Sequence, residues 1–333
     1  MANRDIVAIG TSAGGVEALL FLAKSFPADF PATVLVTLHL PSQSRSTLDE
    51  ILSRAGPLPV AFAGDRQPLR KGRIFIAPPG RHLLVDGDQL SLGIGPRENN
   101  TRPAIDPMLR SVAVCCCGRA IGVLLTGTMG DGASGLHAIS ECGGMTVVQD
   151  PHDAAFPEMP LNALNRISPD HVVHLAEMPK LLEALVHQSA GPARSVSDTV
   201  KYEVEIARTG RASMNDLDRM GRRSTLSCPD CGGVMWEIDG DKSIRFRCHV
   251  GHAYSSEMMS LAQDDSLRRA LGSALRALDE RLALAEKLRQ QAADRGHNQV
   301  TAHWAEKKEE IAREAEIIRQ AVKRADQIAA KAA

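Results

Sequence analysis

The chain has 333 residues, 24% of them charged, and a formal net charge of -1, so no general attraction to nucleic acid or anionic membranes is expected. No apolar run reaches the roughly 18 residues of a membrane span, and residues 6–9 are too short a run for a signal peptide. We therefore expect a cytoplasmic protein without membrane insertion, long enough for more than one domain.

Up to about residue 190, short apolar runs rich in β-branched residues alternate with helical patterns. This alternation is typical of βα units, so we expect a doubly wound, Rossmann-like α/β domain with a mainly parallel sheet over residues 1–190. The predicted strands are Ile6–Ile9, Thr33–Leu38, Arg73–Ile76, Ile121–Leu125, Met145–Val148 and His171–Val173. Helical spacing is found in Val16–Leu22, Pro107–Cys115, Gly135–Ile139 and Pro179–Val186, and a hairpin pattern in Leu83–Leu92.

A glycine-rich turn, residues 10–15 with the sequence GTSAGG, joins the first strand to the first helix. It matches G-x-S-x-G, in which a sharp turn lifts the serine hydroxyl above the sheet. A dinucleotide-binding turn would have a second glycine where Ser12 stands, and an acidic residue where the next strand ends in His39. The motif alone is as consistent with a phosphate-binding or structural turn as with a nucleophile.

Two further polar residues follow predicted strands whose carboxyl ends meet at one edge of a parallel sheet. His39 closes the second strand, and Asp131 lies in the glycine-rich loop after the strand Ile121–Leu125. Taken singly, each has a common structural role, as a hydrogen-bonded loop histidine or a helix N-cap. Together with Ser12 they make up a nucleophile, a base and an orienting acid, so we predict a catalytic triad.

At these residues the chain resembles the catalytic domain of the bacterial chemotaxis protein-glutamate methylesterases, the CheB-type family. The similarity covers residues 5–187 and runs through IVAIGTSAGGVEAL, LHLP, IFIAPPGRHLLV, RPAIDPMLRSVA, LLTGTMGDGASGL, VVQDP and FPEMPLNAL. The resemblance implies that Ser12 is the nucleophile, His39 the general base and then acid, and Asp131 the orienting residue. It also implies backbone oxyanion donors at Ala13 and Thr128, although the family motif often has Thr at the first position and Met-Gly-Asn before the aspartate.

The implied reaction is attack by Ser12 on a glutamate 5-O-methyl ester of a chemoreceptor, release of methanol and hydrolysis of the acyl-enzyme, without a catalytic cofactor. Deamidation of glutamine through the same intermediate stays open. Because His39 must be neutral to accept the serine proton, activity should rise as pH passes an imidazole pKa of roughly 6.5. Arg102 and Arg110 would suit an acidic receptor surface, or they are solvated side chains beside an N-capping Asp106.

Such enzymes are commonly preceded by a phosphorylatable receiver domain. The first catalytic strand begins here at Asp5, so we expect that mode of control to be absent, and any regulation to come from another protein. Residues 191–226 are rich in Ser, Gly and charge, and we interpret them as a linker or wrap-around segment.

Residues 227–255 carry the spacing of a zinc ribbon, and a similar extension is found on some receiver-less members of the family. Cys228 and Cys231 are two residues apart, which lets both thiolates bind one tetrahedral ion, and Cys248 and His252 offer a second pair. We predict a structural zinc, and prefer His252 to His249 because a residue adjacent to Cys248 can hardly bind the same ion. A redox pair is the alternative, but the βαβ context of thioredoxin is missing. Four other cysteines, in apolar context, are interpreted as small buried side chains: Cys115, Cys116, Cys117 and Cys142.

Residues 256–333 are helix-forming, with apolar residues at four-three spacing on both sides of a break at Gly296–Asn298. The pattern predicts an antiparallel helical hairpin that packs on itself, with dimerisation or partner docking as alternatives. Three functions remain at this point: a methylesterase acting on chemoreceptor-like proteins, a catalytically idle scaffold that binds a partner through the ribbon and hairpin, and a small-molecule esterase. The presence of all three triad residues favours an enzyme.

Overall fold

The computed structural model describes residues 3–41, 46–238 and 244–332; the expected outer limits of the first and last domains, Met1 and Ala333, lie outside this range. The chain divides into two compact units, Met1–Met259 and Ser260–Ala333. Each unit is described by itself.

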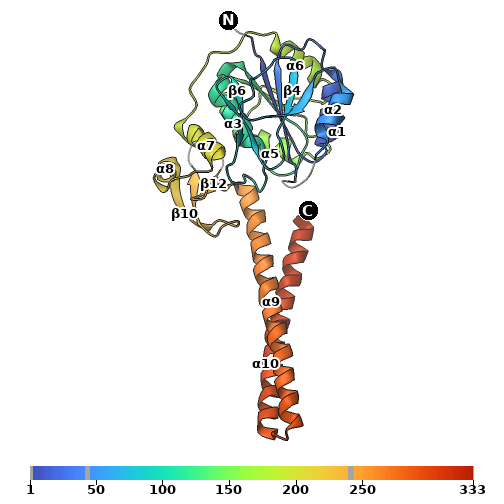
Figure 1. Ribbon diagram of the computed structural model, residues 1–333, viewed down its shortest axis with the longest axis vertical. Helices are drawn as coiled ribbons and strands as arrows, with labels where there is room; N and C mark the ends of the chain where they lie inside the picture. The colour runs from blue at the N-terminus through green and yellow to red at the C-terminus, as the bar shows by residue number, and fades with distance from the viewer. Residues whose placement is uncertain (1–2, 42–45, 239–243, 333) are drawn as a thin grey trace. The chain divides into compact units, whose positions relative to one another are not determined.

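A seven-stranded sheet forms the centre of the first unit (Figure 1). Its strands lie in the order β3 (Val60–Phe62), β4 (Arg73–Ile76), β2 (Thr33–Leu38), β1 (Ile6–Thr11), β7 (Ala120–Leu124), β8 (Met145–Gln149) and β9 (His171–Val173). All six pairings are parallel, which confirms the predicted α/β class. The sequence did not predict β3, because this three-residue edge strand is only half-buried and has no long apolar run.

Helices cover both faces of the sheet. One face is covered by α1 (Gly15–Ser25), α2 (Leu48–Ala55) and α6 (Met178–Val186). The other face is covered by α3 (Ile105–Cys116), α4 (Ala133–Glu141) and α5 (Glu158–Arg166). A short 3-10 turn, η1 (Cys117–Arg119), follows α3. In β1, Val7 and Ile9 belong to the hydrophobic core beneath α1, α2 and α6. Ile6 and Ala8 belong to the core beneath α3, α4 and α5. Both faces of the strand are therefore buried, as is usual in a parallel sheet. The predicted hairpin is β5 (His82–Asp86) and β6 (Gln89–Gly93).

The strand order changes direction at β1. From β1 the chain first forms β2 beside it, then β3 at the edge and β4 between β3 and β2. It then crosses to the other side of β1 with β7, β8 and β9. At such a switch point the crossover connections leave in opposite directions, so a crevice forms at the carboxyl ends of the central strands. The loops after β1, β2 and β7 meet there.

The segment after residue 190, interpreted from the sequence as a linker, contains two helices, α7 (Asp198–Thr209) and α8 (Met214–Met220). Its few large apolar residues are the reason: Ile206 and Leu217 pack around Trp236 in a small core of their own. Trp236 belongs to an antiparallel sheet of β10 (Gly221–Ser227), β11 (Val234–Ile238), β12 (Arg245–Cys248) and β13 (Ala253–Ser255). We call this sheet the ribbon.

The second unit consists of the helices α9 (Ser256–Asp294), which begins in the first unit, and α10 (Asn298–Ala332). They turn at Gly296, which has a φ of 71°. Salt bridges from Lys308 to Glu286 and from Arg319 to Asp279 join the two helices in antiparallel register. Over the part of the chain that the structure describes, neither these nor any other helix has an apolar stretch long enough to cross a bilayer.

Candidate active site and metal-ligand cluster

Ser12 lies in the tight turn between β1 and α1. Gly14 precedes the helix with a φ of 72°, a conformation that side-chain-bearing residues rarely adopt. At Gly10 a Cβ atom would lie 2.2 Å from Cγ2 of Ile105, so only glycine allows α3 to approach β1 this closely. The backbone N–H of Ser12 donates to the carbonyl of Thr126, which fixes the turn against the loop after β7. The two glycines of the motif are therefore explained by backbone geometry and packing.

The imidazole of His39 lies between Ser12 and Asp131. Its Nδ1 is 3.0 Å from Oγ of Ser12, and its Nε2 is 2.7 Å from Oδ2 of Asp131. A carboxylate can only accept, so the ring proton is on Nε2 and Nδ1 is free to accept the serine proton. The structure thus brings together the three residues that the sequence singled out, with the orientation that nucleophilic catalysis requires.

Asp131 is completely buried, and four hydrogen bonds surround its carboxylate. Oδ2 accepts from His39 and from the backbone N–H of Ile105, while Oδ1 accepts from the backbone N–H of Asp106 and from the side-chain amide of Asn99. The carboxylate therefore lies at the N-terminus of α3 and does not cap its own helix, α4. Burial by itself would raise the pKa of Asp131, but His39 and the two backbone N–H groups lower it to about 2.

Asp106 lies next to this carboxylate and behaves in the opposite way. Its Oδ1 accepts from the backbone N–H of Gly135, so it connects α3 to α4. Burial, and then the neighbouring charge of Asp131, raise its pKa to about 7. Two adjacent buried carboxyl groups thus differ in protonation near neutral pH, and Asp131 is the ionised one.

Two backbone N–H groups of the kind needed for an oxyanion hole flank the nucleophile. Within the described ranges, the N–H groups of Ala13 and Thr128 donate to no protein acceptor. The loop that carries Thr128 packs closely on the serine, since a Cβ atom at Gly127 would lie 2.9 Å from Cβ of Ser12. Both positions could stabilise a negatively charged oxygen formed at Ser12.

A cleft of about 370 Å³ opens beside His39. Its lining is His39, Leu40, Pro41, Arg97, Asn100, Thr101 and Arg102. Arg110, considered from the sequence as a second cation for an acidic receptor, is not in this cleft. It is buried on α3 and forms ion pairs with Glu98 and Glu203, whose positions the sequence alone could not indicate.

The residue that the sequence reasoning missed is Asn99, whose amide contacts Asp131. Two successive asparagines with positive φ, Asn99 at 50° and Asn100 at 63°, form the turn that carries it. The Asn-Asn pair is a recognisable turn signal, but the sequence does not show which side chain faces the site.

The four predicted metal ligands lie together at one end of the ribbon. One ligand atom from each of Cys228, Cys231, Cys248 and His252 falls within 4.8 Å of all the others. Cys231 and Cys248 have their sulfurs 3.7 Å apart, and Nδ1 of His252 is 3.5 Å from the sulfur of Cys248. Tetrahedral zinc with bonds of about 2.3 Å to sulfur and 2.0 Å to nitrogen requires separations of about 3.5–3.8 Å between ligands. The residues present therefore fit a zinc ion.

Two tight turns produce this cluster. In the first, the N–H of Gly232 donates to the carbonyl of Cys228, and in the second the N–H of Gly251 donates to that of Cys248. Both glycines have positive φ. A hydrogen bond from Cys228 lowers the pKa of Cys248, which favours the thiolate form that binds metal.

The cysteines of the α/β domain have a different character. Burial raises the pKa of Cys116 to about 12 and that of Cys142 to about 11, so both stay protonated thiols. Cys115 and Cys117 are half-buried.

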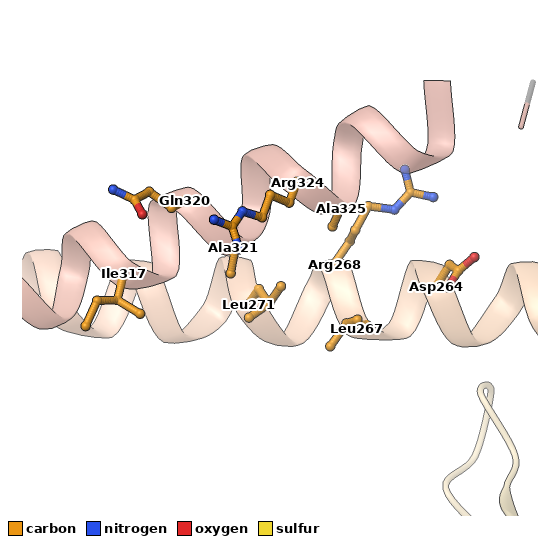
Figure 2. A pocket seen from close by; sticks show the side chains of 9 residues that line it. All are labelled: Asp264, Leu267, Arg268, Leu271, Ile317, Gln320, Ala321, Arg324 and Ala325. Atoms are coloured by element: carbon orange, nitrogen blue, oxygen red, sulfur yellow. The ribbon is translucent and has the colours of Figure 1, made fainter. Parts of the chain in front are cut away.

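The second unit has a hollow of its own, of about 500 Å³, between α9 and α10 (Figure 2). Its lining is Asp264, Leu267, Arg268, Leu271, Ile317, Gln320, Ala321, Arg324 and Ala325. These nine side chains include no serine, cysteine or histidine, so the hollow has none of the nucleophiles or bases found at the carboxyl edge of the sheet.

A serine, a histidine and an aspartate within hydrogen-bonding distance at the switch point of a parallel α/β sheet are an arrangement typical of serine hydrolases. The family model described as CheB methylesterase matches residues 7–182. The chain therefore belongs to the CheB methylesterase family.

Known relatives resemble the first part of the chain. A protein of Leptospira interrogans, provisionally named protein-glutamate methylesterase/protein-glutamine glutaminase, is 34% identical over 180 residues, which are 54% of this chain and 93% of the relative. Protein-glutamate methylesterase/protein-glutamine glutaminase 1 of Chromobacterium violaceum is 38% identical over 193 residues, 57% of this chain and 52% of the relative. The crystal structure of the Thermotoga maritima CheB methylesterase catalytic domain superposes with a TM-score of 0.53 at 29% identity, covering 56% of this chain and 100% of that domain.

Proposed function

We propose that this protein hydrolyses glutamate 5-O-methyl esters on chemoreceptor-like proteins, with Ser12 as nucleophile, His39 as general base and acid, and Asp131 as the orienting acid. The observation that carries the proposal is the position of His39, whose two ring nitrogens lie 3.0 Å from the serine oxygen and 2.7 Å from the carboxylate. Family membership and the printed names of the relatives support the choice of ester.

The reaction follows from these contacts. Oγ of Ser12 forms a bond to the ester carbon while its proton passes to Nδ1 of His39, and the ring becomes a cation stabilised by Asp131. The backbone N–H groups of Ala13 and Thr128 are the candidates to stabilise the negatively charged oxygen. The bond to the methoxy group then breaks, and His39 returns its proton to the leaving oxygen, which gives methanol.

Water completes the cycle. It transfers a proton to His39 and attacks the acyl carbon, and the bond to Oγ breaks as the proton returns to Ser12. A glutamine side chain could form the same acyl-enzyme with ammonia as the leaving group, so deamidation belongs to this proposal as a second activity.

The charge around the cleft beside His39 supports the proposal of an acidic protein substrate. Arg97 is exposed, and Arg102 lies in the same lining. Burial and the nearby charges of Arg81 and Arg97 lower the pKa of Arg102, a sign that several cations share this region. A helix rich in glutamate would offset this positive charge, whereas a small neutral ester gains nothing from it.

In this proposal the ribbon holds one structural zinc through Cys228, Cys231, Cys248 and His252. Four protein ligands leave no open position for a substrate, so the metal takes no part in the hydrolysis. The cytoplasmic placement and a separate regulatory protein, both expected from the sequence, go with the proposal; the seven cysteines, all within the described residues, form no disulfide.

The proposal is tested by methanol release from a methylated chemoreceptor, comparing wild type with Ser12→Ala. The matched control is Ser25→Ala at the last residue of α1, where the hydroxyl donates to the carbonyl of Phe21. We expect release by wild type and Ser25→Ala and none by Ser12→Ala. Equal release by all three would exclude Ser12 as the nucleophile and overturn the proposed mechanism. No release by any would favour the idle scaffold. Turnover of p-nitrophenyl acetate without release from receptors would favour a small-molecule esterase.

A further inference from the structure

Asn99 lies in a tight turn between the α/β domain and the ribbon. Glu98 and Thr101 exchange both of their backbone hydrogen bonds, at 3.2 and 3.0 Å, around the two central asparagines. Both central residues have positive φ, which defines a type I′ turn, and asparagine is one of the few residues that accept this conformation. The turn therefore has a single backbone geometry that places the side chain of Asn99 inward, where it is 4% exposed.

The side chain of Asn99 connects two elements. Its Nδ2 donates to Oδ1 of Asp131 at 3.1 Å, and its Oδ1 accepts from the backbone N–H of Ser255 at 2.9 Å. The amide group of Asn99 therefore has one orientation only, because an ionised carboxylate can only accept a hydrogen bond and a backbone N–H can only donate one. The backbone N–H of Asn99 also donates to the carbonyl of Ala253 at 2.8 Å. Strand β13 of the ribbon thus holds the residue that holds Asp131.

This strand begins directly after a metal ligand. His252 precedes Ala253, and its carbonyl accepts from the N–H of Cys248, a second ligand. The path from the cluster to the triad is therefore short: from His252 through Ala253 to Asn99, and from Asn99 to Asp131. If the turn from Cys248 to His252 became disordered, β13 would lose its fixed position. The backbone groups of β13 that bind Asn99 would then be lost as well.

A buried ion-pair network joins the same two elements beside this path. Glu98, adjacent to Asn99, pairs with Arg110 of α3 and with Arg247 of β12. Glu203 of α7 pairs with Arg110, Arg245 and Arg247. All five side chains are buried. Buried pairs with several partners fix geometry, because separating one charge from its partners is costly.

We infer that Asn99 is a positioning residue for the triad, and that the metal-loaded ribbon completes the active site by holding Asn99 against Asp131. The inference rests on the proposed function, since it assigns a role in the reaction carried out by Ser12. It gives the ribbon a part in catalysis although no ribbon side chain is among the three that react.

The variant for the test is Asn99→Gly, which removes the amide and keeps a residue that accepts positive φ. The matched control is Arg66→Gly, an exposed position with a φ of 56° in the loop after the edge strand β3. The readouts are the rate at which a fluorophosphonate probe labels Ser12, kcat and KM for methanol release, zinc content and the thermal midpoint. All are measured on the full chain, before and after removal of zinc with a chelator.

For Asn99→Gly we expect slower labelling and a lower kcat, each by about 10- to 100-fold, with KM and zinc content unchanged. Arg66→Gly should keep wild-type rates. Removal of zinc should slow wild type by a similar factor, and added zinc should restore it. In Asn99→Gly the same treatment should have little further effect, because the connection is already broken.

Two results would overturn the inference alone: wild-type labelling by Asn99→Gly, or an equal loss in both proteins on zinc removal, which would indicate general damage to the fold. A wild type whose Ser12 is not labelled at all would overturn both the inference and the proposed function.

Discussion

Nε2 of His39 lies 2.7 Å from Oδ2 of Asp131, a buried carboxylate that accepts three further hydrogen bonds. This contact decides which ring nitrogen carries the proton, and so decides that Nδ1 can accept a proton from Ser12. The orientation of the nucleophile's base therefore depends on a residue that does not contact Ser12.

The first prediction is that Asp131→Asn lowers kcat by about 10³- to 10⁴-fold and changes KM little. An amide can turn its N–H groups toward Nε2, which shifts the ring proton to Nδ1 and removes the acceptor for the serine. Steady-state methanol release measures both constants. Asp170→Asn is the control, because Asp170 contacts Thr146 between β8 and β9. A loss below tenfold in Asp131→Asn would contradict the assignment.

The second prediction concerns stability and pH. The pKa of Asp131 is lowered to about 2, so its stabilisation is present above pH 3.8 and is lost as pH falls toward 2. The pKa of Asp106 is raised to about 7, so between pH 3.8 and 7 the folded chain retains a proton that the unfolded chain releases. The contribution of Asp106 to stability therefore falls as pH rises across that range.

Asp106→Asn tests this second effect, because the amide oxygen can still accept from Gly135 but has no proton to lose. We expect the wild-type free energy of unfolding to fall between pH 5 and pH 8, and that of the variant to change less. Urea denaturation at the two pH values, followed by circular dichroism, gives both differences. Parallel losses in the two proteins would show that Asp106 titrates normally.

The third prediction addresses the substrate. Arg97→Gln should raise KM for a methylated receptor about 3- to 10-fold, with the effect shrinking at high salt, while kcat stays the same. The side chain of Arg97 is exposed beside the cleft, so its removal takes away charge without loss of packing. Arg66→Gln, an exposed arginine in the loop after β3, serves as the control. An unchanged KM would mean that the receptor surface is recognised elsewhere.

The sequence predicted the parallel sheet and the positions of Ser12, His39 and Asp131 because their signals are local. Each residue directly follows a buried strand or lies in a glycine-rich loop, and parallel strands bring such ends to one edge. Elements without a continuous apolar run, such as β3 and α2, gave no comparable signal.

The surroundings of the site could not be predicted in this way, because they depend on contacts between distant residues. Arg110 and Arg247 resemble ordinary surface arginines in the sequence, yet both are buried against Glu98, 12 and 149 residues away. The helices of the expected linker, α7 and α8, are likewise held by the core around Trp236, which lies further along the chain. A local sequence pattern does not show which residue from a distant segment will form an ion pair or a packing contact with it in the folded chain.

The last prediction separates the two histidines near Cys248. His252→Ala and Cys228→Ser should each lose the zinc ion, whereas His249→Ala should retain one zinc per chain. His252 contributes an atom to the cluster of four, and His249 is exposed and contributes none. Metal analysis of the purified proteins measures the zinc content directly. Zinc retained in Cys228→Ser would contradict the site, and zinc lost from His249→Ala would show that the neighbouring histidine is the ligand.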